Sequence, residues 1–226
     1  MPIYGVTTQA ASNWPRHPSL SWANWKNGKW IIRDRDKAEE AEITMPEALI
    51  VVAEWWSVKG YLEAKGWVYS NEIYSFAKDP LTIRSTNGEI LYEWLWNEIK
   101  DKVKAVGLKL TKNVHYIDPE KPDELRTFCI KWAGMKSWLD TFTGDARFAS
   151  ADHLICFWKT KEGKTWAVKY TYPTFNVCDK LTPEQKTYQQ KWWTILVGYQ
   201  EAINMSAEEA KNDEVARDDV DELPFN

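Results

Sequence analysis

Fifteen tryptophans in a chain of 226 residues set the first limit on how this sequence can fold. With 10 Tyr and 7 Phe, they make up an unusually large aromatic share. A single domain of this length has a core of ordinary size, and Leu, Ile and Val fill such a core more economically than indole rings. We therefore expect some Trp in the core and some on the surface as flat binding platforms.

The charge of the chain is divided between a faintly basic body and an acidic end. Residues 207–226 contain eight acids and two bases, whereas the whole chain has a net charge of −4, so the remaining body carries +2. A run with so many carboxylates and so few apolar residues buries too little surface to fold alone. We therefore expect residues 206–226 to form a disordered tail.

The tail ends in an apolar plug, Leu223-Pro224-Phe225, which gains nothing from remaining in solvent. The Phe225 ring offers a large contact area, Pro224 stiffens the approach, and the acids suit a basic rim on a partner protein. A frayed terminus with one stray aromatic residue is the plain alternative. The residues that we expect to bind a partner are Asp218, Asp219, Asp221, Glu222, Leu223, Pro224 and Phe225.

The three cysteines, Cys129, Cys156 and Cys178, are widely spaced and form no Cys-x-x-Cys pair. This pattern argues against a disulfide framework and a zinc ribbon, so we expect buried free thiols. The N-terminus lacks a charged-then-apolar signal, and no apolar run reaches membrane-spanning length. The sequence therefore predicts a cytoplasmic protein, in the host cell cytoplasm if it is viral, that does not enter a membrane.

The chain divides into three predicted parts, of which the tail is the last. Residues 1–42 hold four Trp and few aliphatic residues, which predicts an irregular arm packed on the body through its aromatic rings. The body, residues 43–205, begins with β-branched and aromatic runs at 48–56 and 61–69. These runs predict two adjacent antiparallel strands.

Helical spacing occurs in the middle of the body and near its end. Apolar residues recur at helical intervals over 89–106, and Gly107 stands where a left-handed cap belongs. We expect a helix there, although Asn87-Gly88 also suits a hairpin turn. Thr182-Pro183-Glu184-Gln185 is a capping box with proline at the first helical position, which predicts a C-terminal helix. Gly198 inside that helix indicates tight packing.

The segments between these helices predict strands. Residues 108–117 and 125–132 flank a polar loop, and a short helical turn should follow at 134–143. The clearest hairpin covers residues 152–174, with its turn at 161–164. On its second strand, Val168, Tyr170 and Tyr172 alternate with Lys169 and Thr171, so the tyrosines should share one face.

Motifs for catalysis are scarce. His17, His115 and His153 show no ligand spacing, and no nucleophile elbow, phosphate-binding loop or dinucleotide fingerprint occurs. Pairs of carboxylates assembled in three dimensions stay open at this point, because sequence alone cannot place them. We expect a protein that is not an enzyme and that needs neither a cofactor nor a metal.

Aromatic residues interleaved with bases are plentiful, above all in the predicted hairpin. Binders of single strands need stacking rings beside a cationic track, because the strand exposes base faces and a phosphate chain. Any one ring taken alone is more often a core residue. The segments 25–30 and 131–138 repeat the pattern. The residues that we expect to contact single-stranded DNA are Trp158, Lys159, Lys161, Lys164, Trp166, Lys169, Tyr170, Tyr172, Lys131 and Trp132.

The tail motif, Asp218-Asp219-x-Asp221-Glu222-Leu223-Pro224-Phe225, and the order of predicted elements resemble the phage-type single-stranded-DNA-binding proteins. The resemblance implies a mainly β fold with helical decorations: an OB-fold-type antiparallel barrel with a helix between strands 3 and 4 and a C-terminal helix. Bacterial members carry a Gly/Pro/Gln-rich linker before the tip and end on Phe. This chain has neither that linker nor that end, because Asn226 follows the Phe.

The sequence therefore predicts a protein that binds single-stranded DNA without strong sequence preference. It would protect replication, recombination and repair intermediates of a bacteriophage and recruit replication or recombination proteins through its tail. Two alternatives stay open. A Trp-rich carbohydrate-binding module or glycan hydrolase also uses flat rings, and a structural virion protein could use the Trp-rich arm as an assembly anchor. The oligomeric state is left open, with a homo-oligomer allowed.

Overall fold

The computed structural model describes residues 16–37, 39–86, 89–146 and 149–221. The strands are β1 (Ser21–Lys26), β2 (Lys29–Asp34), β3 (Glu40–Ile43), β4 (Ala48–Leu62), β5 (Gly66–Ser70), β6 (Leu81–Ser85), β7 (Ile90–Trp94), β8 (Lys109–Asp118), β9 (Lys121–Ile130), β10 (His153–Thr165) and β11 (Val168–Lys180). The helices are α1 (Trp96–Ala105), α2 (Trp132–Thr141), α3 (Ala149–Asp152) and α4 (Pro183–Asp221). The fold is therefore mainly β with helices attached, as predicted.

The strands form one open, mixed sheet. Its order is β3-β2-β1-β9-β8-β4-β5-β6-β7, and β10 and β11 form a ribbon that joins the sheet where β10 pairs with β4. Strand β1 runs parallel to β9, and the other pairings are antiparallel. Within the described residues β3 and β7 end the main strand order and β11 pairs only with β10, so the sheet does not close. The OB-type barrel is therefore not confirmed, and α1 follows β7 instead of lying between the third and fourth strands.

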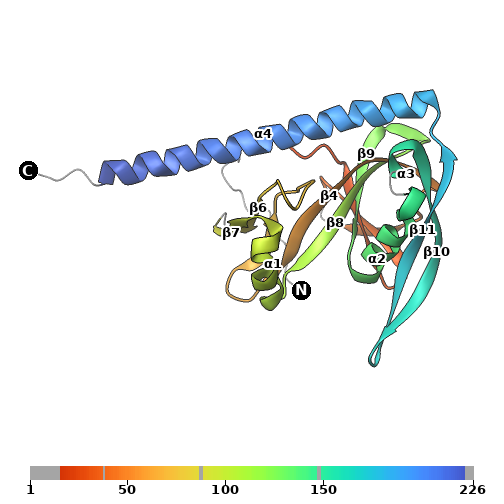
Figure 1. Ribbon diagram of the computed structural model, residues 1–226, viewed down its shortest axis with the longest axis horizontal. Coiled ribbons are helices and arrows are strands. Elements are labelled where there is room, and N and C mark those ends of the chain that lie inside the picture. Colours follow the sequence, from red (N-terminus) through yellow and green to blue (C-terminus); the bar gives the residue numbers. More distant parts are fainter. Residues whose placement is uncertain (1–15, 38, 87–88, 147–148, 222–226) are drawn as a thin grey trace, which may run out of the picture.

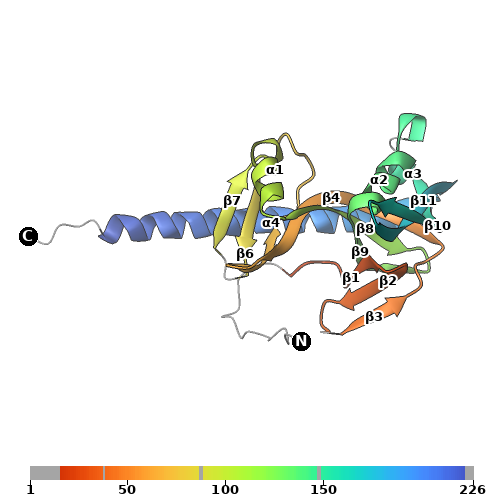
Figure 2. The ribbon, with the colours of Figure 1, turned by 90° about the horizontal axis from the view of Figure 1, so that it is seen from below.

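Three apolar clusters hold this sheet to the elements that cover it. The first lies under α2 and the ribbon and is built largely of rings, among them Phe128, Trp138 and Phe175. The second lies between α1 and the β4–β6 region, and the third lies between α4 and the β4–β9 region. Figures 1 and 2 show α4 running along one side of the sheet and continuing past β6 and β7.

The N-terminal segment is more regular than predicted. Residues 21–43 form three strands at one edge of the sheet instead of an irregular arm. Asn27 and Gly28 both have positive φ values, 50° and 84°, which suits a two-residue hairpin turn. Trp30 is buried in the first cluster, and Trp25 donates its Nε1 proton to the carbonyl of Thr171 at 3.0 Å. The aromatic rings thus pack this segment on the body; residues 1–15 lie outside the described residues.

The helix predicted over 89–106 begins later. Residues 90–94 form β7, which pairs with β6, and α1 starts only at Trp96. Pairing with β6 stabilises this segment as a strand more than the helical spacing of its apolar residues stabilises it as a helix. Tertiary contacts commonly outweigh local sequence preference in this way. The predicted cap is confirmed, because Gly107 has a φ of +79° directly after the helix.

Helix α4 begins as the capping box predicts. The Thr182 amide donates to Gln185 Oε1 at 2.9 Å, and the Gln185 amide donates to Thr182 Oγ1 at 3.2 Å. The expected tight packing at Gly198 is wrong, since no atom lies within 4 Å of an added Cβ there. The helix also continues to Asp221, so residues 206–221 are helical where we expected disorder. Residues 222–226, with the apolar plug, lie outside the described residues.

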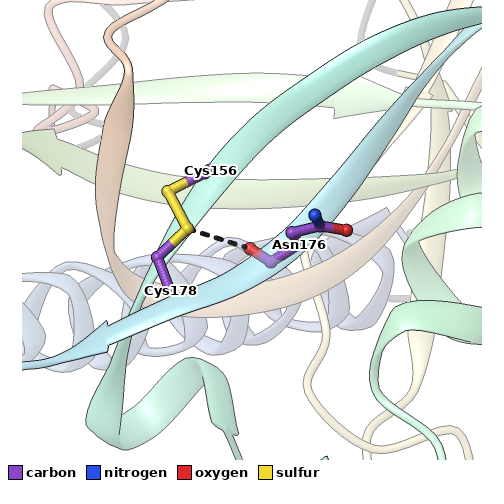
Figure 3. Close-up of a disulfide and its surroundings, with 3 residues drawn as sticks. All are labelled: Cys156, Asn176 and Cys178. Atoms are coloured by element: carbon purple, nitrogen blue, oxygen red, sulfur yellow. Dashed lines mark hydrogen bonds between the residues drawn. A yellow bond between two sulfur atoms is a disulfide. The ribbon is translucent and has the colours of Figure 1, made fainter.

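One disulfide corrects the expectation of free thiols. Cys156 on β10 and Cys178 on β11 are bonded, with their Cα atoms 6.2 Å apart, at the base of the ribbon (Figure 3). Only the pairing of the two strands brings residues 22 positions apart together, which spacing alone does not reveal. Cys129 is buried and free, as predicted. No helix in the described part of the chain is long and apolar enough to cross a membrane.

Candidate functional site

The β10–β11 ribbon projects from the body and carries most of the predicted binding residues (Figure 1). Its turn is not at 161–164. Strand pairing continues to Thr165 and Val168, so Trp166 and Ala167 form the turn. Trp166 has a φ of +56° and a side chain that is 93% exposed at the tip. The sequence pattern missed this because Gly163, which resembles a turn residue, lies inside β10.

Gly163 lies beneath a ring and is not part of the turn. It lies directly opposite Tyr170, and a Cβ added at Gly163 would approach that ring to 2.5 Å. The ring of Tyr170 therefore lies flat across the backbone of its neighbouring strand. Tyr172 faces Lys161 in the same way, and the two tyrosine rings are 6.2 Å apart. These residues make one face of the ribbon aromatic and cationic.

The opposite face of the ribbon carries Lys164 and Lys169, which are direct cross-strand partners. Because side chains alternate between the two faces of a strand, these lysines point away from the tyrosines. Two like charges directly opposite each other destabilise a strand pair. The ribbon therefore holds a cross-strand pair of lysines near its tip, on the face away from the tyrosines.

Trp132 stands at the junction of β9 and α2, beside the ribbon. Its side chain is 71% exposed and its backbone has a φ of +53°, a left-handed conformation that bulky residues rarely adopt. Such a backbone costs about 1–3 kcal/mol and occurs most often at functional sites. The Lys109 ammonium lies 5.1 Å from the centre of the Trp132 ring, within range of a cation–π contact. The fold thus keeps the Trp132 ring in solvent at a cost in conformational free energy.

Four lysines gather at the strand ends around Trp132. Lys26 ends β1, Lys109 begins β8, Lys131 follows β9, and Lys59 lies directly opposite Lys109 on β4. Burial lowers the pKa of Lys131, and the charges of Lys59, Lys109 and Lys26 act in the same direction. Lys26 pairs with Glu40 at 2.6 Å. Among the described residues no ion pair involves the other three, so their charge is available to an anion.

Two grooves run along the aromatic face of the ribbon and share Tyr170, Tyr172 and Lys136. One, of about 760 Å³, is also lined by Trp25, Lys26, Lys131 and Trp132. The other, of about 670 Å³, is lined by Trp158, Lys159 and Lys161 together with residues of α2. Both grooves therefore place flat rings beside ammonium groups.

Most of the predicted site is brought together by this arrangement. Trp158, Lys159, Lys161, Tyr170, Tyr172, Lys131 and Trp132 line the two grooves. Trp166 lies at the tip of the ribbon, and Lys164 and Lys169 lie on its other face. Lys59 and Lys109 carry no local sequence signal for this site, because their approach depends on the strand order β9-β8-β4.

The chemistry of this site suits a ligand with flat faces and negative charge. Comparison of the chain with protein-family models, curated proteins and solved structures finds no match. Among the described residues, the one carboxylate that lines either groove is Asp140, and it is paired with Lys136 at 2.5 Å.

Proposed function

We propose that this protein binds single-stranded DNA, without strong sequence preference, along the aromatic face of the β10–β11 ribbon. The observation that carries the proposal is the meeting of exposed rings with lysines that have no acidic partner among the described residues. Trp132 and the tyrosines offer stacking surfaces, and Lys59, Lys109 and Lys131 offer charge for phosphates. Base–aromatic stacking contributes about 1–3 kcal/mol per base and tolerates any sequence, because every base has a flat face.

A single strand suits this surface better than a duplex. The rings of Trp132, Tyr170 and Tyr172 line a groove, where they could stack only on bases whose faces are free. In a duplex those faces are covered by neighbouring base pairs, and the protein would be left with phosphate contacts alone. Bound in this way, the protein would protect intermediates of replication, recombination and repair, as expected of a bacteriophage protein that works in the cytoplasm of its host cell. It would act as a binding protein and not as an enzyme.

The tail contributes a second function to the proposal. Its acids would compete with phosphates for the lysines, and its apolar plug would recruit a replication or recombination protein. Helix α4 starts beside the ribbon and ends at the opposite end of the molecule (Figures 1 and 2). A rigid α4 would therefore present Asp221 to the groove of a neighbouring copy on the same strand more readily than to its own groove.

Fluorescence anisotropy of a labelled dT oligonucleotide tests the proposal. We expect tight binding at low salt, an affinity that falls as salt rises, and strong competition by unlabelled poly(dT) but weak competition by duplex. Deleting residues 207–226 should tighten the binding at low salt and abolish partner recruitment, whereas Phe225→Ala should abolish only the recruitment. Equal competition by duplex, or no binding of the oligonucleotide at all, would overturn the proposal.

Glycan binding is the second candidate, because flat rings also stack on sugars. The lysines argue against it, since a neutral sugar gives no reason to keep cross-strand pairs such as Lys59 and Lys109. A hydrolase would also need two free carboxylates about 5–9.5 Å apart. Among the described residues both grooves offer only Asp140, which Lys136 holds. A soluble glycan added to the anisotropy experiment should therefore displace no DNA.

A further inference from the structure

A second group of reactive side chains lies beneath α4, away from the ribbon. His17 precedes β1, Glu72 lies between β5 and β6, and His115 lies on the central strand β8. The His115 side chain is fully buried, and those of His17 and Glu72 are 15% and 14% exposed. One nitrogen or oxygen from each residue lies within 4.8 Å of the others. Three parts of the chain far apart in sequence thus converge on one point.

The atoms that face this point make no well-aligned hydrogen bond, although Glu72 Oε2 lies within ion-pair distance of both histidines. Within the described chain His17 Nε2, Glu72 Oε2 and His115 Nε2 are buried polar atoms that make no hydrogen bond of good geometry. The other side of each group is held: His115 Nδ1 lies 2.8 Å from Thr127 Oγ1, and the Asn113 amide donates to Glu72 Oε1. Buried polar atoms without partners are rare and call for an explanation such as a bound ion.

We propose that His17, Glu72 and His115 bind a first-row divalent transition metal of the zinc type. Glu72 Oε2 lies 3.1 Å from His115 Nε2 and 3.7 Å from His17 Nε2. Zinc bonds of about 2.0–2.2 Å in a tetrahedron place neighbouring ligand atoms about 3.3–3.5 Å apart, so these two separations match with small adjustments. Imidazole nitrogens favour zinc over magnesium or calcium, which prefer oxygen ligands.

An acidic cavity borders this point on the side of Glu72. It has a volume of about 570 Å³ and lies between α4 and the sheet. Glu72 lines it together with three further acids, Asp79, Glu93 and Glu201. These carboxylates would attract a cation to the entrance, and the cavity would supply water for the fourth coordination position. The site would therefore have both its ligands and an entry path.

His17 is the ligand that has to adjust. The Ser19 amide donates to His17 Nδ1 at 3.0 Å, which places the proton of a neutral ring on Nε2 when no metal is bound. Ligation through Nε2 moves that proton to Nδ1, and the contact with Ser19 then opens. His115 needs no such change, because Thr127 Oγ1 can accept from its Nδ1. The metal would thus link the segment before β1 to the sheet. Tyr199 of α4 covers this link, since the centre of its ring lies 4.8 Å from the centre of the His17 ring.

Metal titration of the full chain, freed of metal with a chelator, tests this site. We expect one Zn²⁺ per chain by calorimetry and a Co²⁺ absorption spectrum of a four- or five-coordinate nitrogen and oxygen site. Zinc at about 100 times its Kd should raise Tm by roughly 5–10 °C. His17→Gln and Glu72→Gln should abolish the Tm shift, and the matched control His153→Gln, a histidine outside the cluster, should keep it.

Circular dichroism and a cooperative unfolding transition establish that each variant is folded. Two results would overturn the site: wild-type protein that takes up no metal, or a Tm shift that survives in both His17→Gln and Glu72→Gln. A thiolate charge-transfer band in the Co²⁺ spectrum would also overturn it, because that band would assign the metal to Cys129, the free cysteine. None of these outcomes depends on whether the protein binds DNA.

Discussion

Trp138 and Trp166 show that one residue type serves two different regions of this molecule. Trp138 is fully buried, packs against Phe128, Phe142 and Phe175, and donates its Nε1 proton to Glu54 at 3.0 Å. Trp166 stands 93% exposed at the tip of the ribbon on a left-handed backbone. The excess of Trp is therefore not explained by a larger core, because Trp132, Trp158 and Trp166 are exposed at the ribbon and the end of β9, and Trp67 and Trp94 are exposed at β5 and β7.

The lysines divide in the same way. Lys112 is buried in the body, pairs with Glu54 at 2.9 Å and lies 4.2 Å from the centre of the Trp56 ring. Lys59 and Lys109, by contrast, face each other across two strands with no acid paired to either in the described structure. Lys112 is thus paired within the body, whereas Lys59 and Lys109 have no paired acid among the described residues. This contrast separates a lysine that stabilises the fold from lysines that we propose contact DNA.

The largest effect should come from the interior. Trp138→Ala removes a ring from the first cluster and leaves Glu54 without one of its donors. We expect a loss of about 3–5 kcal/mol in the free energy of unfolding, measured by urea denaturation. The DNA affinity of the molecules that remain folded should not change. A loss below about 1 kcal/mol would show that this ring does not belong to the core.

The surface rings should show the reverse behaviour. Each of Trp132→Ala, Trp158→Ala and Trp166→Ala should weaken binding of a dT oligonucleotide by about 1–3 kcal/mol and leave Tm nearly unchanged. Trp94 on β7 is a matched control, because it is 64% exposed but lies at the far edge of the sheet. Trp94→Ala should leave the affinity unchanged. If the three variants lose stability instead of affinity, these rings belong to the fold.

Lys131 should affect both stability and DNA binding, because its partly buried charge lowers the free energy of unfolding. Burial lowers its pKa, so the folded state releases this proton before the unfolded state does. The wild-type unfolding free energy should therefore rise as pH approaches the ordinary lysine pKa of about 10.4. Lys131→Met should remove that rise, stabilise the protein by roughly 0.5–1 kcal/mol at neutral pH and weaken DNA binding.

Two measurements check the Lys131 prediction. Urea unfolding at about pH 8 and pH 10 gives the stability of both proteins in the two protonation states. The dependence of DNA affinity on salt should lose about 0.7 from its logarithmic slope, the value for one phosphate contact on a single strand. A Lys131→Met protein that is less stable than the wild type would show that the ammonium supports the fold.

The smallest effect should come from Gly163→Ala. The added Cβ would meet the Tyr170 ring, a flexible side chain that can turn away, so the fold should tolerate the change. We expect a loss of up to about 1 kcal/mol in DNA affinity, less than the removal of a whole ring costs. Gly198→Ala in α4 is the matched control: it has no neighbour within 4 Å and should stabilise the helix by about 1 kcal/mol without changing affinity. Equal affinity for both variants would mean that the placement of Tyr170 is unimportant.

Features set by local chemistry could be predicted from the sequence. The capping box of α4, the left-handed Gly107 and the strands near 108–117 depend on neighbouring residues, and all three are confirmed. Features set by strand order could not. The parallel pairing of β1 with β9 and the Cys156–Cys178 bond require segments that the chain brings together only on folding.

The site divides in the same manner. Tyr170 and Tyr172 share a face of the ribbon, as their spacing of two residues predicts. The placement of Lys169 on the other face follows from the same alternation. The pairing of Lys164 with Lys169 depends on the strand register, and therefore on where the turn lies, so a turn expected at 161–164 could not predict it.

The most direct test of the two classes of Trp is the quenching of tryptophan emission by poly(dT). The triple variant Trp132→Phe, Trp158→Phe and Trp166→Phe keeps aromatic faces for stacking but removes the exposed indoles. We predict that poly(dT) quenches the wild-type emission strongly and that most of this quenching is lost in the triple variant, while anisotropy still reports DNA binding. Quenching that persists undiminished in the triple variant would contradict the account. The DNA would then quench other tryptophans than the three that are exposed on the ribbon and at the end of β9.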